Sequence, residues 1–503
     1  MRHGMLRSFV VCLVCVWVVV GARQAQALGA ARLTEPDRRA VEGYGAAFVD
    51  AINAPDDGAR RAIIERICAP SFIEKVTIEK ILKQNGAIAG HLGRAEFHSA
   101  ELAEMARGDT MSRVLHVYAK GEKTGRWHDL QMRVDPEPPY LLREMAFMAD
   151  VTEPVYLPNG GLTDAGARDW FNSYIDRLRE KEGLSGAVLL AVGDEVVFER
   201  YFGFADAAEK TPVTPDIRFN LGSGNKSFTA LAVMMLDTDG KLSLTDPIAK
   251  YFPDFPDQEA AKQVTIAHLL SHTSGVAEYW TKENAPAVQA ATGAKDLLAL
   301  VYKEGMSATP GEVYRYSNSN FVLAGLIVEK ASGKPYDEFV RERITGPLGL
   351  KDTDTFAMDG SVPRLAERLS RGEGHAWVPA AAAPAGRRGG AAGGGFSTPR
   401  DMLKFARALV GGRVVAKETL ARMTTSQTPA ATRAEGDDYG FGFILSKVGE
   451  QHCFGHGGIA KGVNFEFRYY PALDATLITF SNQDNGAYDD LRRTAEKLLT
   501  GVR

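Results

Sequence analysis

Ser223-x-x-Lys226 offers the most direct route to covalent chemistry, and no other Ser-x-x-Lys occurs in the chain. The apolar run Phe228–Leu236 follows it and predicts a helix that begins near Ser223. Lys226 would then share a helix face with Ser223, above the positive N-terminus of the helix. A serine hydroxyl is a poor nucleophile until a base removes its proton. Lys226 can be that base only if its pKa is lowered, or it can assist a second base.

Tyr316-Ser317-Asn318 is the only Tyr-x-Asn in the chain. We expect a neighbouring ammonium to favour the phenolate of Tyr316, which would take the serine proton and later protonate the leaving group. Asn318 would hold a substrate carbonyl and fix Lys226. Without such partners, Tyr316 would simply be a loop tyrosine before a helix from Asn320 to Lys330.

His456-Gly457-Gly458 is a third candidate element. Two glycines allow the backbone to approach a ligand closely, and a free N–H there can face an oxyanion. As a Lys/His-x-Gly pattern it is not unique, because Lys447-Val448-Gly449 and His91-Leu92-Gly93 fit that pattern as well. His91 lies in a different predicted domain and Lys447 lies nearer a predicted turn, so we favour His456.

Several other chemistries lack their residues. The sequence contains no His-Glu-x-x-His, no Gly-x-x-x-x-Gly-Lys-Ser/Thr and no Gly-x-Ser-x-Gly. Zincin, P-loop and α/β-hydrolase mechanisms therefore lack their residues. The net charge of −4 leaves no basic excess to neutralise phosphates, so nucleic acid is not an expected partner.

Together and in this order, the three elements resemble the motifs of the class C β-lactamase-like serine hydrolase family. Further phrases match that family: Phe219–Gly222, His268–Gly275, Pro310-Gly311, Gly393–Thr398 and Tyr439–Gly442. The resemblance covers roughly residues 163–503. It implies an α/β (α+β) domain of the β-lactamase/transpeptidase type, with an antiparallel sheet flanked by helices and a helical subdomain.

The resemblance implies acyl transfer through a covalent ester of Ser223, with Lys226 and Tyr316 moving the proton, and it implies that no metal and no cofactor are needed. It places the oxyanion on the backbone N–H groups of Ser223 and Ile459, and substrate contacts on Asn318 and His456-Gly457-Gly458. His272, in the matched His-Thr-Ser-Gly phrase, is expected to be a structural turn residue rather than a base.

The third motif bears on the substrate. The class C β-lactamases that the chain resembles carry Lys-Thr-Gly there, and a permanent cation suits the carboxylate of a β-lactam or a peptide end. Histidine is mostly neutral near pH 7. We therefore favour a carboxylesterase-type activity on an ester or small amide. The alternatives are a D,D-carboxypeptidase or D-aminopeptidase acting on peptidoglycan-type peptides, a β-lactamase, and a non-catalytic exported binding module.

The elements that position these motifs can be read from periodicity. Both ends of the hydrolase region carry strands, and we expect them to join one sheet. The predicted elements are a helix (Asp164–Lys181), strands Ser185–Val192 and Glu195–Phe202, strands Asn464–Tyr470 and Ala475–Ser481, and a last helix (Tyr488–Leu499). The Ala-, Gly- and Pro-rich stretch Ala380–Gly395 is expected to be a mobile loop that can border a site.

Residues 33–151 predict a separate small α+β domain, joined by a linker at residues 152–162. Two helices are predicted before three strands: Arg38–Asn53, Ala59–Ile67, Ser112–Ala119, Arg126–Val134 and Tyr140–Met148. This order resembles the nuclear-transport-factor-2-like (NTF2-like) domain. A homodimer through this domain is a further hypothesis.

Residues 1–27 have the order of a secretory signal peptide. Arg2 and Arg7 precede the apolar run Phe9–Val20, and the small-x-small sequence Ala25-Gln26-Ala27 follows. The run is shorter than the ~20 residues of a spanning helix. We expect an exported, periplasmic or secreted protein without a stable membrane span after cleavage, in which Cys68 and Cys453 are buried and reduced.

Overall fold

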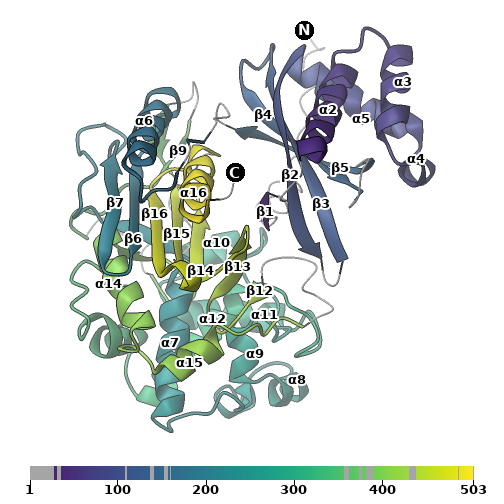
Figure 1. The fold of residues 1–503 in the computed structure, drawn as a ribbon. Coiled ribbons are helices and arrows are strands. Elements are labelled where there is room, and N and C mark those ends of the chain that lie inside the picture. Colours follow the sequence, from purple (N-terminus) through teal and green to yellow (C-terminus); the bar gives the residue numbers. More distant parts are fainter. Residues whose placement is uncertain are drawn as a thin grey trace, which may run out of the picture.

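The computed structural model describes residues 28–30, 35–107, 110–135, 141–151, 157–158, 160–355, 362–372, 376–380, 389–429, 438–484 and 486–501. Two large antiparallel sheets organise most of these residues (Figure 1). The front sheet packs against one apolar core, and the second sheet lies between two others. The predicted signal peptide and residues 152–156 and 159 of the predicted linker lie outside the described residues. The mixed α/β class with antiparallel sheets is confirmed.

The front region places four helices before most of its strands. The helices are α2 (Glu35–Ile52), α3 (Asp57–Ile67), α4 (Pro70–Val76) and α5 (Ile78–Leu92). The strands β1 (Leu28–Ala30), β2 (Ala95–Arg107), β3 (Thr110–Gly121), β4 (Trp127–Val134) and β5 (Leu142–Val151) form a sheet in sequential order. The three predicted strands are present. Sequence reasoning missed β2 because its many Ala and Glu residues are poor strand formers. The likeness to an NTF2-like domain remains a prediction.

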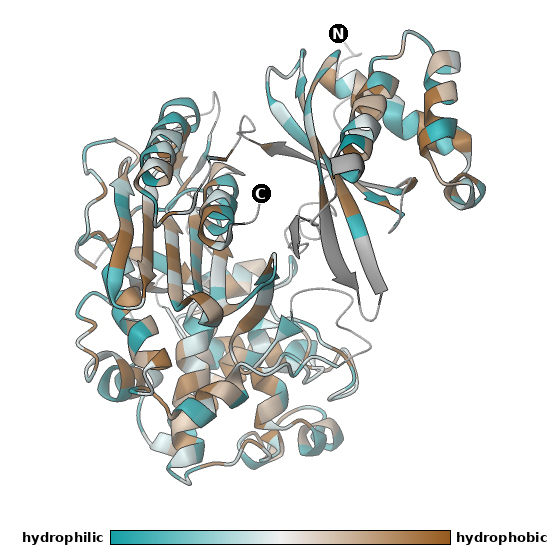
Figure 2. Ribbon diagram, in the orientation of Figure 1, coloured by the Kyte–Doolittle hydropathy of each residue, from teal (hydrophilic) through white to brown (hydrophobic). Residues whose placement is uncertain are grey.

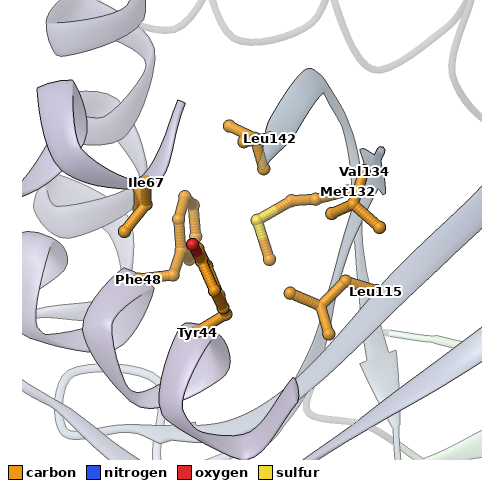
Figure 3. A pocket seen from close by; sticks show the side chains of 7 residues that line it. All are labelled: Tyr44, Phe48, Ile67, Leu115, Met132, Val134 and Leu142. Carbon is orange, nitrogen blue, oxygen red and sulfur yellow. The ribbon is translucent and has the colours of Figure 1, made fainter. Parts of the chain in front are cut away.

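Helix α2 packs its apolar face on this sheet. Val41, Phe48 and Ile52 are buried in the front core, at helical spacing. Between the helices and the sheet lies a cavity of about 10 Å³ (Figure 3), lined by Tyr44, Phe48, Ile67, Leu115, Met132, Val134 and Leu142. That volume is about the room one water molecule needs, and the lining is almost entirely apolar. The cavity is therefore a packing void rather than a substrate site.

The hydrolase region is built on a seven-stranded sheet, in the order β12-β13-β14-β15-β16-β6-β7. Its strands are β6 (Gly186–Val192), β7 (Glu195–Phe202), β12 (Asp438–Tyr439), β13 (Ile444–Val448), β14 (Gln451–Ala460), β15 (Val463–Tyr470) and β16 (Ala475–Ser481). Strand β16 pairs with β6 along its whole length, from Ala475↔Val192 to Ser481↔Gly186. This confirms that the two ends of the region join one sheet.

Helices cover both faces of this sheet. Val188 and Leu190 point to one face, where α6 (Ala165–Glu182) and α16 (Gly486–Thr500) pack. Leu189 points to the other face and joins the large core shared with the helical part. Figure 2 shows hydrophobic residues along the strands of the sheet. Helix α16 also meets the front region, since Lys497 Nζ lies 3.0 Å from Glu101 Oε2.

The helical part contains α7 (Asn225–Thr238), α8 (Gln258–Gln263), α9 (Ile266–Leu270), α10 (Ala285–Ala290), α11 (Ala294–Glu304), α12 (Asn318–Ser332), α13 (Tyr336–Val340), α14 (Pro399–Val410) and α15 (Lys417–Met423). Two short strand pairs, β8 (Phe219–Gly222) with β11 (Gly395–Ser397) and β9 (Leu369–Arg371) with β10 (Trp377–Pro379), connect it to the sheet. Helices α7 and α12 are buried along most of their length. Both begin at a candidate motif, so the core fixes the positions of these motifs.

Cys68 and Cys453 are free and buried, as expected. Burial raises the pKa of Cys68 to about 12 and that of Cys453 to about 11, so neither thiol is a ready nucleophile. Among the described residues, no helix has the length and apolar character needed to cross a membrane. Over the same residues, no group of three or more His, Cys, Asp or Glu side chains is placed to hold a metal ion.

Candidate active site

Ser223 lies in the turn between β8 and α7. The helix begins at Asn225, two residues later than the sequence predicted, because Ser223 and Gly224 form the turn that enters it. The backbone N–H of Lys226 donates to the Ser223 carbonyl at 2.9 Å. The turn brings Lys226 Nζ to 3.0 Å from Ser223 Oγ. The predicted proximity of the two side chains is therefore confirmed, with the serine before the helix rather than in it.

Lys226 is completely buried and has three oxygen partners. Its Nζ lies 3.0 Å from Ser223 Oγ, 2.8 Å from Asn318 Oδ1 and 2.6 Å from the carbonyl oxygen of Ala392. None of the three carries a charge. Burial lowers the pKa of Lys226 to about 7, although the carboxylate of Glu278 opposes the shift.

The identity of these partners decides where a neutral Lys226 directs its lone pair. A neutral amine has two protons and one lone pair, and the oxygens of Asn318 and Ala392 can only accept hydrogen bonds. The neutral amine therefore donates both of its protons to these two oxygens. The lone pair is then left facing Ser223 Oγ, whose hydroxyl can donate. This arrangement can remove a proton from the serine.

Tyr316 is hydrogen-bonded to the same serine. Burial raises the pKa of Tyr316 above its ordinary value, and a hydrogen bond with Ser223 only partly offsets this. The expectation that the phenolate is favoured is therefore wrong, because desolvation and the negative charge of Glu278 outweigh the hydrogen bond with Ser223. The ring is held between two groups: it stacks on His272 at 4.2 Å between centroids, and Lys226 Nζ lies 4.9 Å from its centroid. A protonated Tyr316 can pass a proton but does not hold the charge.

Asn318 is the first residue of α12, so the predicted helix begins two residues earlier than Asn320. Its side chain contacts Lys226 as expected. Its nitrogens contact a residue that sequence reasoning missed: the backbone N and Nδ2 of Asn318 donate to Glu278 Oε2 at 2.6 and 3.0 Å. Glu278 follows the matched phrase that ends at Gly275 by three residues, and this adjacency was the available signal.

The sequence analysis did not single out Ala392, although it did single out the segment that contains this residue. The stretch Ala380–Gly395 was expected to be a mobile loop that can border a site, and its described part contacts Lys226 through Ala392. Asn225 holds the same segment, with Nδ2 donating to Gly390 O at 3.1 Å and Oδ1 accepting from Gly395 N at 3.0 Å. Residues 381–388 lie outside the described residues, so the prediction of mobility is untested.

His272 has φ 59°, in the left-handed region, and is buried. Its Nδ1 accepts from Ser317 N at 3.1 Å, which ties the turn to the start of α12. Burial, with Lys226 and His456 nearby, lowers the pKa of His272 well below its ordinary value. These features agree with the expected structural turn residue.

The third motif lies within β14 and approaches the serine through its main chain. A Cβ on Gly458 would lie 1.9 Å from the carbonyl oxygen of Leu221 and 2.9 Å from Ser223 N, so only glycine allows this contact. A Cβ on Gly222 would lie 3.2 Å from Ile459 N. The backbone nitrogens of Ser223 and Ile459 therefore lie beside the same turn. The side chain of Ile459 is 51% exposed and points away from the core.

His456 is buried, and both of its ring nitrogens are engaged. Nδ1 lies 2.6 Å from Gly457 O, and since a carbonyl can only accept, Nδ1 carries the proton. Nε2 then accepts from the Tyr439 hydroxyl at 2.8 Å. Burial lowers the pKa of His456 to about 3, with Lys226 adding to the shift. The third motif thus presents a neutral imidazole and no cation.

A model of the β-lactamase family matches residues 171–501, so the chain belongs to this family. Penicillin-binding protein 4* of Bacillus subtilis is 30% identical over 362 residues, which cover 66% of this chain and 76% of that protein. Esterase EstB of Burkholderia gladioli is 29% identical over 311 residues, covering 55% of this chain and 79% of that protein.

The solved structures agree with this assignment. The D-amino acid amidase of Ochrobactrum anthropi is similar with a TM-score of 0.55 and 27% identity, over 66% of this chain and 98% of that chain. Penicillin-binding proteins, an esterase and an amidase are thus all among the relatives. The chain is a serine hydrolase of the β-lactamase family.

Proposed function

We propose that the protein is an exported hydrolase that cleaves an uncharged ester or small amide through an acyl-enzyme on Ser223. The observation that carries the proposal is the contact set of Lys226, in which two partners can only accept hydrogen bonds and the third is the serine hydroxyl. A lysine with a pKa of about 7 is half neutral at neutral pH and can act as a base there.

In the proposed reaction, Ser223 Oγ attacks the substrate carbonyl carbon while its proton moves to Lys226 Nζ. The backbone N–H groups of Ser223 and Ile459 hold the oxyanion, each typically contributing ~2.7–4 kcal/mol to the barrier reduction. The intermediate collapses, and the leaving group departs with a proton relayed through Tyr316. Water then attacks the carbonyl carbon of the acyl ester while one of its protons moves to Lys226 Nζ. The ester bond breaks, and Ser223 Oγ takes that proton back as it leaves.

The neutral His456 supports an uncharged substrate. A carboxylate would gain no ion pair from this side chain, whose nitrogens are already engaged with Gly457 and Tyr439. An ester or a small amide needs no such cation. Two apolar side chains near these residues in the chain are exposed: Trp280, which follows Glu278, is 41% exposed, and Ile459, which follows the third motif, is 51% exposed. Both suit an apolar acyl or leaving group.

A peptidase acting on D-amino-acid peptides or amides is the second candidate. The likeness to the Ochrobactrum anthropi D-amino acid amidase favours it over a β-lactamase. Export is proposed from residues 1–27, and the intact mass of the protein from its native host is expected to correspond to a chain that begins at Leu28.

The test is intact-mass spectrometry of the purified mature chain after exposure to a fluorophosphonate. One adduct per chain is expected, mapped to Ser223 by digestion and lost in Ser223→Ala. A folded protein without an adduct would contradict the proposal. Turnover of p-nitrophenyl acetate at more than about tenfold that of a chromogenic β-lactam would support the esterase assignment, and the opposite ratio would overturn it.

A further inference from the structure

We infer that Glu278 is a positioning residue of this active site, which orients the Asn318 amide so that its oxygen faces Lys226. The inference rests on the proposed function and extends it to a residue outside the three motifs. Asn318 Nδ2 donates to Glu278 Oε2 at 3.0 Å, and Asn318 Oδ1 accepts from Lys226 Nζ at 2.8 Å. A carboxylate only accepts, so it selects the amide orientation in which the nitrogen faces Glu278 and the oxygen faces the lysine.

The same carboxylate caps α12 from a distant part of the chain. The N-cap residue Ser317 makes no side-chain capping bond, and Glu278 Oε2 accepts from the Asn318 backbone N–H at 2.6 Å instead. A negative charge at a helix N-terminus is favourable. One oxygen of Glu278 therefore fixes both the main chain and the side chain of Asn318.

Neighbouring contacts keep Glu278 in this place. Its Oε1 accepts from Trp280 N at 2.8 Å. On either side of it, Ser319 Oγ donates to Ala277 O at 2.6 Å and accepts from Tyr279 N at 3.0 Å. The segment that carries Glu278 is thus attached to the first turn of α12 at several points, and the carboxylate has little freedom to leave Asn318.

Charge gives the role a measurable signature. The titratable groups around Lys226 are Tyr316, His272, His456 and Glu278, and burial keeps both histidines neutral near pH 7. Glu278 is then the negative charge that supports the ammonium form of Lys226. Removing it should make Lys226 lose its proton at a lower pH, which a purely structural side chain would not do.

The experiment measures kcat/KM for p-nitrophenyl acetate against pH in the wild type, Glu278→Gln and Glu278→Asp. For Glu278→Gln we expect a fall of about tenfold at pH 8 and an acid limb displaced by about half a pH unit or more to lower pH. Glu278→Asp keeps the charge and shortens the side chain, so its limb should stay near the wild-type position while kcat/KM falls. If Glu278→Gln does not fold, Glu278→Asp alone still decides: wild-type kcat/KM in that variant would overturn the inference.

Two further measurements separate the possible failures. Glu283→Gln makes an equal charge change at an exposed position five residues further along the chain and should leave both kcat/KM and the limb unchanged. In an Asn318→Ala background, Glu278→Gln should cause less than a twofold additional fall, because its effect passes through Asn318. Additive losses or an unmoved limb would overturn the inference. A wild type that fluorophosphonate does not label would instead overturn the proposed function.

Discussion

Both regions of the molecule bury a titratable side chain, and the partners of that side chain decide its charge. In the front region, Asp129 is fully buried, with His116 Nδ1 at 2.9 Å and Gln131 Nε2 at 2.8 Å. Burial alone would raise the pKa of Asp129, but its contacts with His116 outweigh this and lower it. The carboxylate remains charged within a buried hydrogen-bonded cluster and has a structural role.

In the hydrolase region, burial instead shifts Lys226 toward its neutral form. Its hydrogen-bond partners are neutral oxygens, so burial dominates and lowers its pKa to about 7. Burial therefore does not by itself make a titratable group reactive. A buried group becomes a usable base where the fold provides hydrogen bonds without an opposite charge in direct contact.

Lys226→Arg tests the comparison most severely. Arginine keeps the positive charge but cannot lose its proton, so Ser223 would have no base. We expect kcat/KM for an ester to fall by about 10²–10⁴-fold. Lys241→Arg, the same change at an exposed position, is the control. An active Lys226→Arg enzyme would show that the lysine acts only through its charge.

Asp129→Ala tests the front region. Removing one partner of a buried pair leaves the other unpaired, and we expect a loss of about 3 kcal/mol in the free energy of unfolding of that region. Urea titration followed by hydrogen exchange measures this, with kcat/KM within twofold of the wild type. Because the pKa of Asp129 is lowered by folding, its contribution is present above the unfolded value of about 4. The gap between wild type and variant should close as the pH falls below that value. A pH-independent gap would contradict a charged Asp129 in the folded protein.

The pH profile of the wild type follows from the same difference. Catalysis requires neutral Lys226, so kcat/KM should fall about tenfold per pH unit below about pH 7. Above pH 7 it should stay level to about pH 9, because burial raises the pKa of Tyr316 above its ordinary value. An acid limb centred below pH 5 would assign the base to another group.

Tyr439→Phe carries the smallest expected effect. It removes the hydroxyl that donates to His456 Nε2 and leaves a buried acceptor without a donor. We expect a loss of about 1 kcal/mol in the free energy of unfolding, with kcat/KM for a neutral ester changed by less than about threefold. Thermal unfolding and ester kinetics check this. A large loss of activity would mean that the His456–Tyr439 pair takes part in proton transfer.

Regular periodicity made much of the fold predictable. Strands Glu195–Phe202 and Ala475–Ser481 were predicted with the bounds that the structure has, because each is rich in β-branched and aromatic residues and lies between turn residues. Strand β2 (Ala95–Arg107) and helix α5 (Ile78–Leu92) were not predicted. In β2 the residue types oppose the structure, and pairing with β3 overrides them.

The candidate site divides in the same way. The sequence by itself indicated that Lys226 lies beside Ser223, since residues three apart share one face of a helical turn, and it identified glycines where β14 approaches that turn. Only the tertiary structure decided that Lys226 is close to neutral, that Tyr316 keeps its proton, and that Ala392 and Glu278 complete the contacts. The contacts of Lys226 depend on burial and on oxygen atoms of Asn318 and Ala392, which lie more than fifty residues from Lys226 along the chain. Local spacing contains no information about either, because a pKa is set by the groups that replace water around the side chain.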